Sequence, residues 1–126
     1  MTLKTTNKEN RIIREFINKY LDKQYKIDWN VIKLSKADGI KHNQMVATVC
    51  CWLLHNNIPF ATQCRFTSNY RPDIICPTGL PVRIIEVRNT ETDKRTKEKE
   101  VRIPTELLTE IAFVDANLEF KEKMIL

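Results

Sequence analysis

The chain has 126 residues, which corresponds to one domain of ordinary size, and its 42% of apolar and 29% of charged residues are typical of a folded protein with a buried core. Only two glycines are present, Gly39 and Gly79, so glycine-rich loops for nucleotide phosphates are excluded, and with them the ATPases and dehydrogenases that depend on such loops. The 21 Lys and Arg residues exceed the 16 Asp and Glu residues, and the net charge of +5 suits a polyanionic partner without identifying one.

The first 40 residues are predicted to form an N-terminal helical extension. Apolar side chains recur over residues 8–25 at the i, i+3, i+4 spacing of an amphipathic helix. Asp28 is expected to cap a second, short helix that carries Trp29. Gly39 then breaks the chain, so residues 1–40 are expected to precede the main body of the fold.

Residues 41–126 are predicted to form the core of the domain, beginning with a long helix over residues 41–56. The apolar period then changes from 3.6 to 2, which predicts a strand over residues 60–66. Two apolar runs, at residues 72–76 and 82–88, predict the next two strands. The core therefore starts with one helix and three consecutive strands.

The last part of the chain is predicted to add a helix and a fourth strand. Residues 90–100 have the composition of an exposed, charged helix, and Thr105 is expected to cap a further short helix before a strand over residues 111–114. Three strands before a helix and one after it favour a mixed β-sheet. The sequence thus predicts a single α/β domain over residues 1–126, with a central mixed sheet flanked by helices.

Cysteine usage and hydropathy indicate a cytoplasmic protein. No apolar run reaches the length that a bilayer span needs, and the first ten residues lack the apolar core of a signal peptide, so we expect no membrane association. The four cysteines contain no CxxC pair and do not show zinc-site spacing with the two histidines. We therefore expect reduced, small apolar core residues at Cys50, Cys51, Cys64 and Cys76.

Charged residues interrupt the most strand-like part of the chain. Asp73 opens one predicted strand, whereas Glu86 and Arg88 lie within the apolar run of the next. Alternate strand residues share a face, so Glu86 and Arg88 are expected on the same face, about 7 Å apart. If the two strands pair through the turn at residues 77–81, Asp73 comes to lie beside them.

Two carboxylates and a cation at one sheet edge predict phosphodiester hydrolysis. Close carboxylates can share Mg²⁺, which prefers oxygen ligands and keeps several waters. Such an ion activates water and neutralises charge that builds on the phosphate, while a neighbouring basic side chain holds the phosphate. The alternative is a structural one, in which Glu86 and Arg88 form an exposed ion pair on a half-solvated strand face.

Residues 42 to about 114 resemble the PD-(D/E)XK nuclease superfamily, whose restriction-endonuclease-like fold occurs in archaeal Holliday junction resolvases and in small restriction and repair nucleases. Pro72-Asp73 resembles the PD element, and Glu86-Val87-Arg88 resembles the (D/E)XK element, with twelve residues between Asp73 and Glu86. The predicted order of helices and strands also follows that of the family.

The resemblance implies roles for the residues of this motif. Asp73 and Glu86 would be metal ligands, and the Val87 carbonyl would be a third ligand, for Mg²⁺ or for Mn²⁺. Arg88 stands where the family usually has lysine and would stabilise the transition state. Guanidinium keeps the positive charge but is larger, planar and a poorer proton donor than ammonium.

Supporting residues follow from the same resemblance. The first core helix of the family often supplies a further acid, and His42 or Gln44 would have to serve here; a partly buried histidine at a helix end is the alternative for His42. Gln63 is expected to line the cleft and to orient water or metal. Contact with the phosphate backbone is expected from the basic residues that follow the catalytic strand, which are Lys94, Arg95, Lys97 and Lys99. The alternative is a solvated helix face, on which runs of mixed charge also occur.

The function expected from these residues is that of a metal-dependent DNA endonuclease. Small members of the family commonly act as homodimers, and the apolar face of the helix at residues 8–25 is the candidate interface. The alternative is a catalytically inactive DNA-binding or interaction protein on the same fold. Arg88 in place of lysine, and the lack of a clear acid on the helix, support that alternative.

Overall fold

The computed structural model describes residues 5–79, 82–89 and 102–126. Its regular elements are the helices α1 (Asn7–Tyr20) and α2 (Ile40–His55) and the strands β1 (Ala61–Thr62), β2 (Ile74–Ile75), β3 (Ile84–Arg88) and β4 (Ile111–Asp115). Short 3-10 helices occur at Lys36–Asp38, Thr105–Leu107 and Glu122–Met124. The chain is therefore a mixed α/β protein, as the sequence predicted.

The four strands form one mixed sheet in the order β1-β2-β3-β4. The pairs β1–β2 and β2–β3 are antiparallel, whereas β3 and β4 run parallel over the full length of both strands. The expected pairing of the strands on either side of residues 77–81 is present, because Ile74 lies opposite Ile85 and Ile75 lies opposite Ile84. This register brings the start of β2 beside the end of β3.

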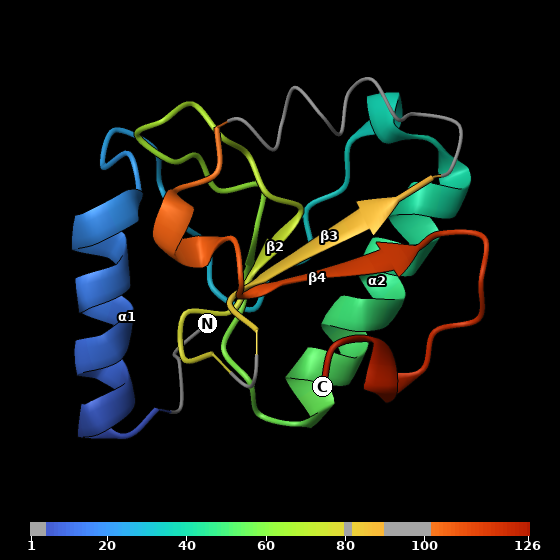
Figure 1. Cartoon of the computed structure of the whole chain (residues 1–126). Helices are drawn as coiled ribbons and strands as arrows, with labels where there is room; N and C mark the ends of the chain where they lie inside the picture. Colours follow the sequence, from blue (N-terminus) through green and yellow to red (C-terminus); the bar gives the residue numbers. More distant parts are fainter. Residues whose placement is uncertain (1–4, 80–81, 90–101) are drawn as a thin grey trace.

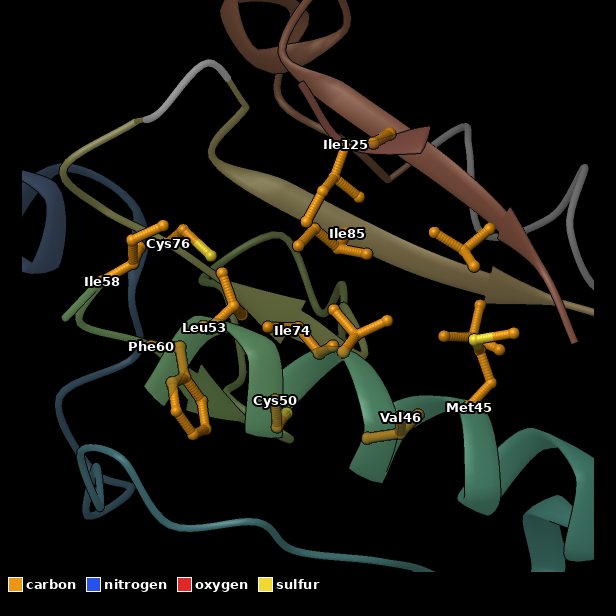
Figure 2. Packing of buried hydrophobic residues seen from close by; sticks show 14 residues of the cluster. Met45, Val46, Cys50, Leu53, Ile58, Phe60, Ile74, Cys76, Ile85 and Ile125 are labelled. Atoms are coloured by element: carbon orange, nitrogen blue, oxygen red, sulfur yellow. The ribbon is translucent and has the colours of Figure 1, made fainter. Parts of the chain in front are cut away.

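Helix α2 covers one face of the sheet. Its buried side chains fall on one side of the helix and lie against apolar residues of β2, β3 and β4. Figure 1 shows α1 and α2 on opposite sides of the strands, and Figure 2 shows the side chains that fill the space between α2 and the sheet. The α2 residues in this core are Met45, Val46, Val49, Cys50 and Leu53.

Helix α1 covers the other face, although residues 1–40 were expected to form an extension outside the core. Phe16 and Tyr20 are buried there with Phe66 and Tyr70, and the Phe16 and Phe66 rings meet edge to face at a centroid distance of 6.0 Å. The apolar face of α1 is thus used within the chain. Because the core of the same chain already buries Ile13, Phe16 and Tyr20, this face does not provide the free apolar surface that the predicted dimer interface needs, and the homodimer itself stays a prediction.

The first helix begins at a capping box and ends earlier than predicted. Thr6 accepts a hydrogen bond from the Glu9 amide, and the Glu9 side chain accepts one from the Thr6 amide. The helix ends at Tyr20 instead of residue 25, because Leu21 forms an antiparallel bridge to Phe66. Tertiary pairing therefore overrides the helical pattern in its last residues.

The predicted short helix after Asp28 is absent from the described residues. Trp29 instead forms an antiparallel bridge to Ala61, and the Lys33 amide donates to the Thr62 hydroxyl at 2.9 Å. Asp28 pairs with the Lys33 ammonium at 2.6 Å and caps no helix. This segment runs beside β1, where backbone partners outside the segment replace those of a helix.

The strand predicted over residues 60–66 was wrong in length. Gln63 has a φ of +54°, a left-handed conformation that breaks an extended strand, so β1 contains only Ala61 and Thr62. The strand predicted over residues 72–76 is likewise reduced to Ile74 and Ile75. Thr105 begins a 3-10 helix whose N-cap position is Pro104, so the expected Thr105 cap is also absent.

The prediction of a core position is confirmed for Cys50, Cys64 and Cys76 and is wrong for Cys51, and all four cysteines are free thiols. Cys51 is exposed, because it lies on the side of α2 opposite to the sheet. Burial raises the pKa of Cys50 to about 12 and that of Cys64 to about 11, and it also raises the pKa of Cys76. No helix within the described parts of the chain is long and apolar enough to cross a lipid bilayer.

Candidate active site

Asp73 and Glu86 meet where β2 begins and β3 approaches its end. The Asp73 amide donates to Oε1 of Glu86 at 2.7 Å, and the Val87 amide donates to Oδ2 of Asp73 at 2.8 Å. Each carboxylate thus accepts a hydrogen bond from the backbone of the other strand. These two bonds extend the pairing of β2 with β3 and fix both carboxylates at the same end of these two inner strands.

Burial makes these hydrogen bonds energetically important. Only 7% of Glu86 is exposed, and a buried carboxylate is strongly disfavoured unless charge-assisted hydrogen bonds compensate for lost hydration. The alternative of an exposed ion pair on a solvated strand face is therefore wrong for Glu86. The residue lies in a semi-enclosed environment where its charge interacts strongly with neighbouring groups.

Tyr70 lies in the core beside the two carboxylates, and sequence analysis did not identify it. Its side chain is fully buried, and burial raises the pKa of the Tyr70 phenol well above its ordinary value. The negative charges of Glu86 and Asp73 raise this pKa further. Tyr70 therefore remains a neutral hydrogen-bond donor at physiological pH. In the sequence, its place two residues before Pro72-Asp73 is the signal that could have identified it as a neighbour of the site.

His42 is the α2 residue that reaches Asp73. Its Nε2 atom lies 3.3 Å from Oδ2 of Asp73, and both side chains are 16% exposed. A carboxylate oxygen only accepts hydrogen bonds, so this contact favours the tautomer or charge state in which Nε2 carries a proton. His42 is thus both a partly buried residue near a helix end and a neighbour of the site.

Gln44 does not share this position. Its side chain is exposed, and two residues of an α-helix are separated by about 200° around the axis, so Gln44 points away from the side on which His42 meets Asp73. Its carbonyl accepts a hydrogen bond from the Thr48 hydroxyl at 2.8 Å. Of the two candidates on this helix, only His42 contributes to the site.

Arg88 ends β3 on the same face as Glu86, and it is held by an aromatic ring. Its guanidinium carbon lies 3.5 Å from the centroid of Phe113, which is the β4 residue opposite Glu86. Planar guanidinium stacks well on an aromatic face, whereas ammonium forms no such planar contact. Arg88 therefore has a structural support that matches the planar shape of its guanidinium.

Gln63 lies beside Asp73 despite the early end of β1. The Gln63 amide donates to the Asp73 carbonyl at 3.4 Å, and the exposed side chain lines the same surface hollow as Asp73. This hollow has a volume of about 370 Å³, and we call it the Asp73 hollow. Its lining residues are Tyr25, Ser35, Asp38, Gln63, Arg65, Arg71, Pro72 and Asp73.

The side chains at the site offer oxygen ligands to a divalent ion. No group of three or more His, Cys, Asp and Glu side chains suited to a metal is present among the described residues. Mg²⁺ requires less, because it is commonly held by one or two carboxylates and retains several waters for substrate oxygens. The paired carboxylates of Asp73 and Glu86 fit that requirement, whereas the role of the Val87 carbonyl stays a prediction.

The basic run after β3 lies outside the described residues, so its contact with DNA stays a prediction: Lys94, Arg95, Lys97 and Lys99.

Comparison of the chain with models of protein families, with curated proteins and with solved structures found no match.

Proposed function

We propose that this protein is a metal-dependent endonuclease of the PD-(D/E)XK type that hydrolyses phosphodiester bonds in DNA. The observation that carries the proposal is a pair of hydrogen bonds, in which the Glu86 carboxylate accepts from the Asp73 amide and the Asp73 carboxylate accepts from the Val87 amide. It supports a rigid pair of oxygen ligands at a sheet edge, which is the arrangement that Mg²⁺ or Mn²⁺ binding needs. A restriction-endonuclease-like fold is supported by the order of α2 and the four strands, including the parallel pair β3–β4.

The residues around this pair have complementary roles in the proposed reaction. A bound divalent ion would supply a water of lowered pKa and would neutralise charge on the phosphate. Asp73 and Glu86 would hold it, and the Arg88 guanidinium would stabilise the negative charge that develops on the phosphoryl oxygens. His42 would keep Asp73 in position through the 3.3 Å contact, and Gln63 would orient water in the Asp73 hollow.

The proposed setting is the cytoplasm, with the protein acting as a homodimer so that both DNA strands are cut. Four free thiols support a reducing compartment. A dimer would use a surface other than the buried face of α1, because Ile13, Phe16 and Tyr20 already contribute to the core of the chain. The positive net charge of +5 supports a nucleic acid as the polyanionic partner.

Cleavage of supercoiled plasmid and of branched DNA, with Mg²⁺ and with EDTA, tests the proposal. The wild-type protein is expected to cut only with the metal, and Asp73→Asn is expected to abolish cutting because it keeps the side-chain shape but removes a ligand charge. Exposed Asn18→Asp on α1 serves as a control that also changes one charge but lies on the outer face of that helix. Equal metal-dependent cutting by wild type and Asp73→Asn would refute the proposed site.

A second candidate is a DNA-binding protein on the same fold that has lost catalysis. It is favoured by two features, namely the Arg88–Phe113 stacking in place of a lysine and the contact of Asp73 with His42 in place of an acid. This candidate predicts DNA binding without cleavage in any divalent metal. Partial cutting by Arg88→Lys, in the absence of wild-type activity, would support it.

A further inference from the structure

A tight loop brings two arginines together directly before Asp73. The Phe66 amide donates to the Tyr70 carbonyl at 2.8 Å, and the Asn69 amide donates back to the Phe66 carbonyl at 2.9 Å, which closes residues 66–70 into a loop. Phe66 and Tyr70 are both buried, so the loop is anchored in the core. Arg65 and Arg71 flank its two ends and line the same surface.

A third arginine is attached to this loop from a distant part of the chain. The Ser68 hydroxyl donates to the carbonyl of Arg102 at 2.7 Å. Arg102 lines a second hollow, of about 310 Å³, together with Arg65 and Arg71. We call Arg65, Arg71 and Arg102 the arginine surface.

The arginine surface is continuous with the candidate active site. Arg65 and Arg71 line both the second hollow and the Asp73 hollow, in which Gln63 and Asp73 also lie. A polymer that crosses both hollows would therefore contact the arginines while one of its groups lies at Asp73. A small ligand confined to either hollow would not use all three arginines and Asp73 together.

None of the three arginines forms an ion pair with a carboxylate among the described residues, although Asp38 and Asp73 also line the Asp73 hollow. Arg65 donates to the Tyr25 hydroxyl at 2.6 Å, which orients its guanidinium without cancelling its charge. Arginine has five donors in a planar fork that matches phosphate oxygens, so such a cluster favours phosphate groups.

We propose that the arginine surface binds the sugar-phosphate backbone of duplex DNA beside the phosphate that is cut. The inference rests on the proposed function for the identity of the polymer, and it assigns backbone contacts to residues outside the basic run at 94–99. DNA follows the two hollows from Arg102 to Asp73, and the arginines fix its register on the protein. They act on binding and positioning, whereas Asp73 and Glu86 act on hydrolysis.

The test is a salt titration of DNA binding without metal, so that no cutting interferes. Fluorescence anisotropy with a labelled 20-base-pair duplex in EDTA, from 50 to 200 mM KCl, gives the slope of log affinity against log salt. The variant Arg65→Gln/Arg71→Gln/Arg102→Gln is expected to lower the magnitude of this slope by about 2.7, since each lost phosphate contact removes about 0.9. Between 50 and 200 mM KCl, the factor by which the affinity for DNA falls would be roughly 40-fold smaller for the variant than for wild type.

A matched control removes the same number of positive charges from exposed positions on other surfaces. The control Lys8→Gln/Arg14→Gln/Lys123→Gln changes α1 and the C-terminal 3-10 helix and is expected to leave the slope within about 0.5 of wild type. If the triple arginine variant does not fold, Arg71→Gln/Arg102→Gln keeps the Arg65–Tyr25 hydrogen bond and is expected to lower the slope by about 1.8.

The outcomes separate this inference from the proposed function. A folded arginine variant with the slope of the control would overturn the arginine surface, even if the wild-type protein cuts DNA. A lowered slope in a protein that never cuts DNA with Mg²⁺ or Mn²⁺ would uphold the surface and refute the nuclease. Absence of measurable wild-type binding at 50 mM KCl would overturn the arginine surface as well.

Discussion

Replacement of Glu86 by glutamine separates the two roles of its carboxylate. One role is structural, because Oε1 accepts the Asp73 amide hydrogen at 2.7 Å in a residue that is only 7% exposed. The proposed second role is to hold a divalent ion with its negative charge. Glu86→Gln keeps a carbonyl oxygen in the same position but removes the charge, whereas Glu86→Ala removes both.

The expected effects on stability differ between the two variants. In Glu86→Ala the partly buried Asp73 amide loses its acceptor, which costs about 1–3 kcal/mol, and a cavity adds to that cost. In Glu86→Gln the hydrogen bond weakens by about 1 kcal/mol, because neutral acceptors are weaker than charged ones. Relief of the repulsion between Glu86 and Asp73 offsets this loss, so Glu86→Gln is expected to unfold within about 1 kcal/mol of wild type.

Urea unfolding without metal measures both free energies, and plasmid cleavage with Mg²⁺ measures the catalytic effect. Both variants are expected to be inactive, although only Glu86→Ala is strongly destabilised. The reasoning is refuted if Glu86→Gln cuts DNA at the wild-type rate, since the charge then has no role in hydrolysis. It is also refuted if Glu86→Gln is destabilised as much as Glu86→Ala, since the negative charge is then itself required for the fold.

Three further predictions concern Arg88, Tyr70 and the basic run at residues 94–99. Arg88→Ala is expected to slow plasmid cleavage by about 10²-fold, equivalent to about 2.7 kcal/mol, while Arg88→Lys retains activity; wild-type rates for Arg88→Ala would show that its charge does not act on the phosphate. The raised pKa of Tyr70 means that the folded protein keeps the phenol proton at a pH where the unfolded chain loses it, so stability is fully present below about pH 10 and falls above it. Urea unfolding from pH 8 to 11 should therefore show a decline in wild type that is steeper than in Tyr70→Phe, by about 1.4 kcal/mol per pH unit above pH 10, and parallel curves would contradict this. Charge reversal of the basic run, which consists of Lys94, Arg95, Lys97 and Lys99, is expected to lower the slope of log affinity for DNA against log salt. An unchanged slope in a folded variant would show that the run is a solvated face.

Local pattern in the sequence determined the elements that depend on short-range spacing. The helical period at residues 41–56 predicted α2 to within a residue at each end, because that helix buries one regular apolar stripe against the sheet. The runs around Ile74 and Ile84 predicted β2 and β3, and the turn between them predicted their antiparallel pairing. The meeting of Asp73 with Glu86 followed from this pairing, since strand register converts spacing in the sequence into position at an edge.

Only the tertiary structure decided features that depend on partners far away in the chain. Residues 28–33 have a helical pattern, yet pairing of Trp29 with Ala61 satisfies their backbone outside the segment. The contact of His42 with Asp73 depends on how α2 lies across the sheet, which no local period specifies.

The arginine surface depends on the tertiary structure in the same way. Arg65 and Arg71 are separated by a loop that closes through its own backbone hydrogen bonds, and Arg102 is joined to them through Ser68. Sequence spacing therefore determined which residues are able to form the carboxylate pair, and long-range packing decided which side chains surround it.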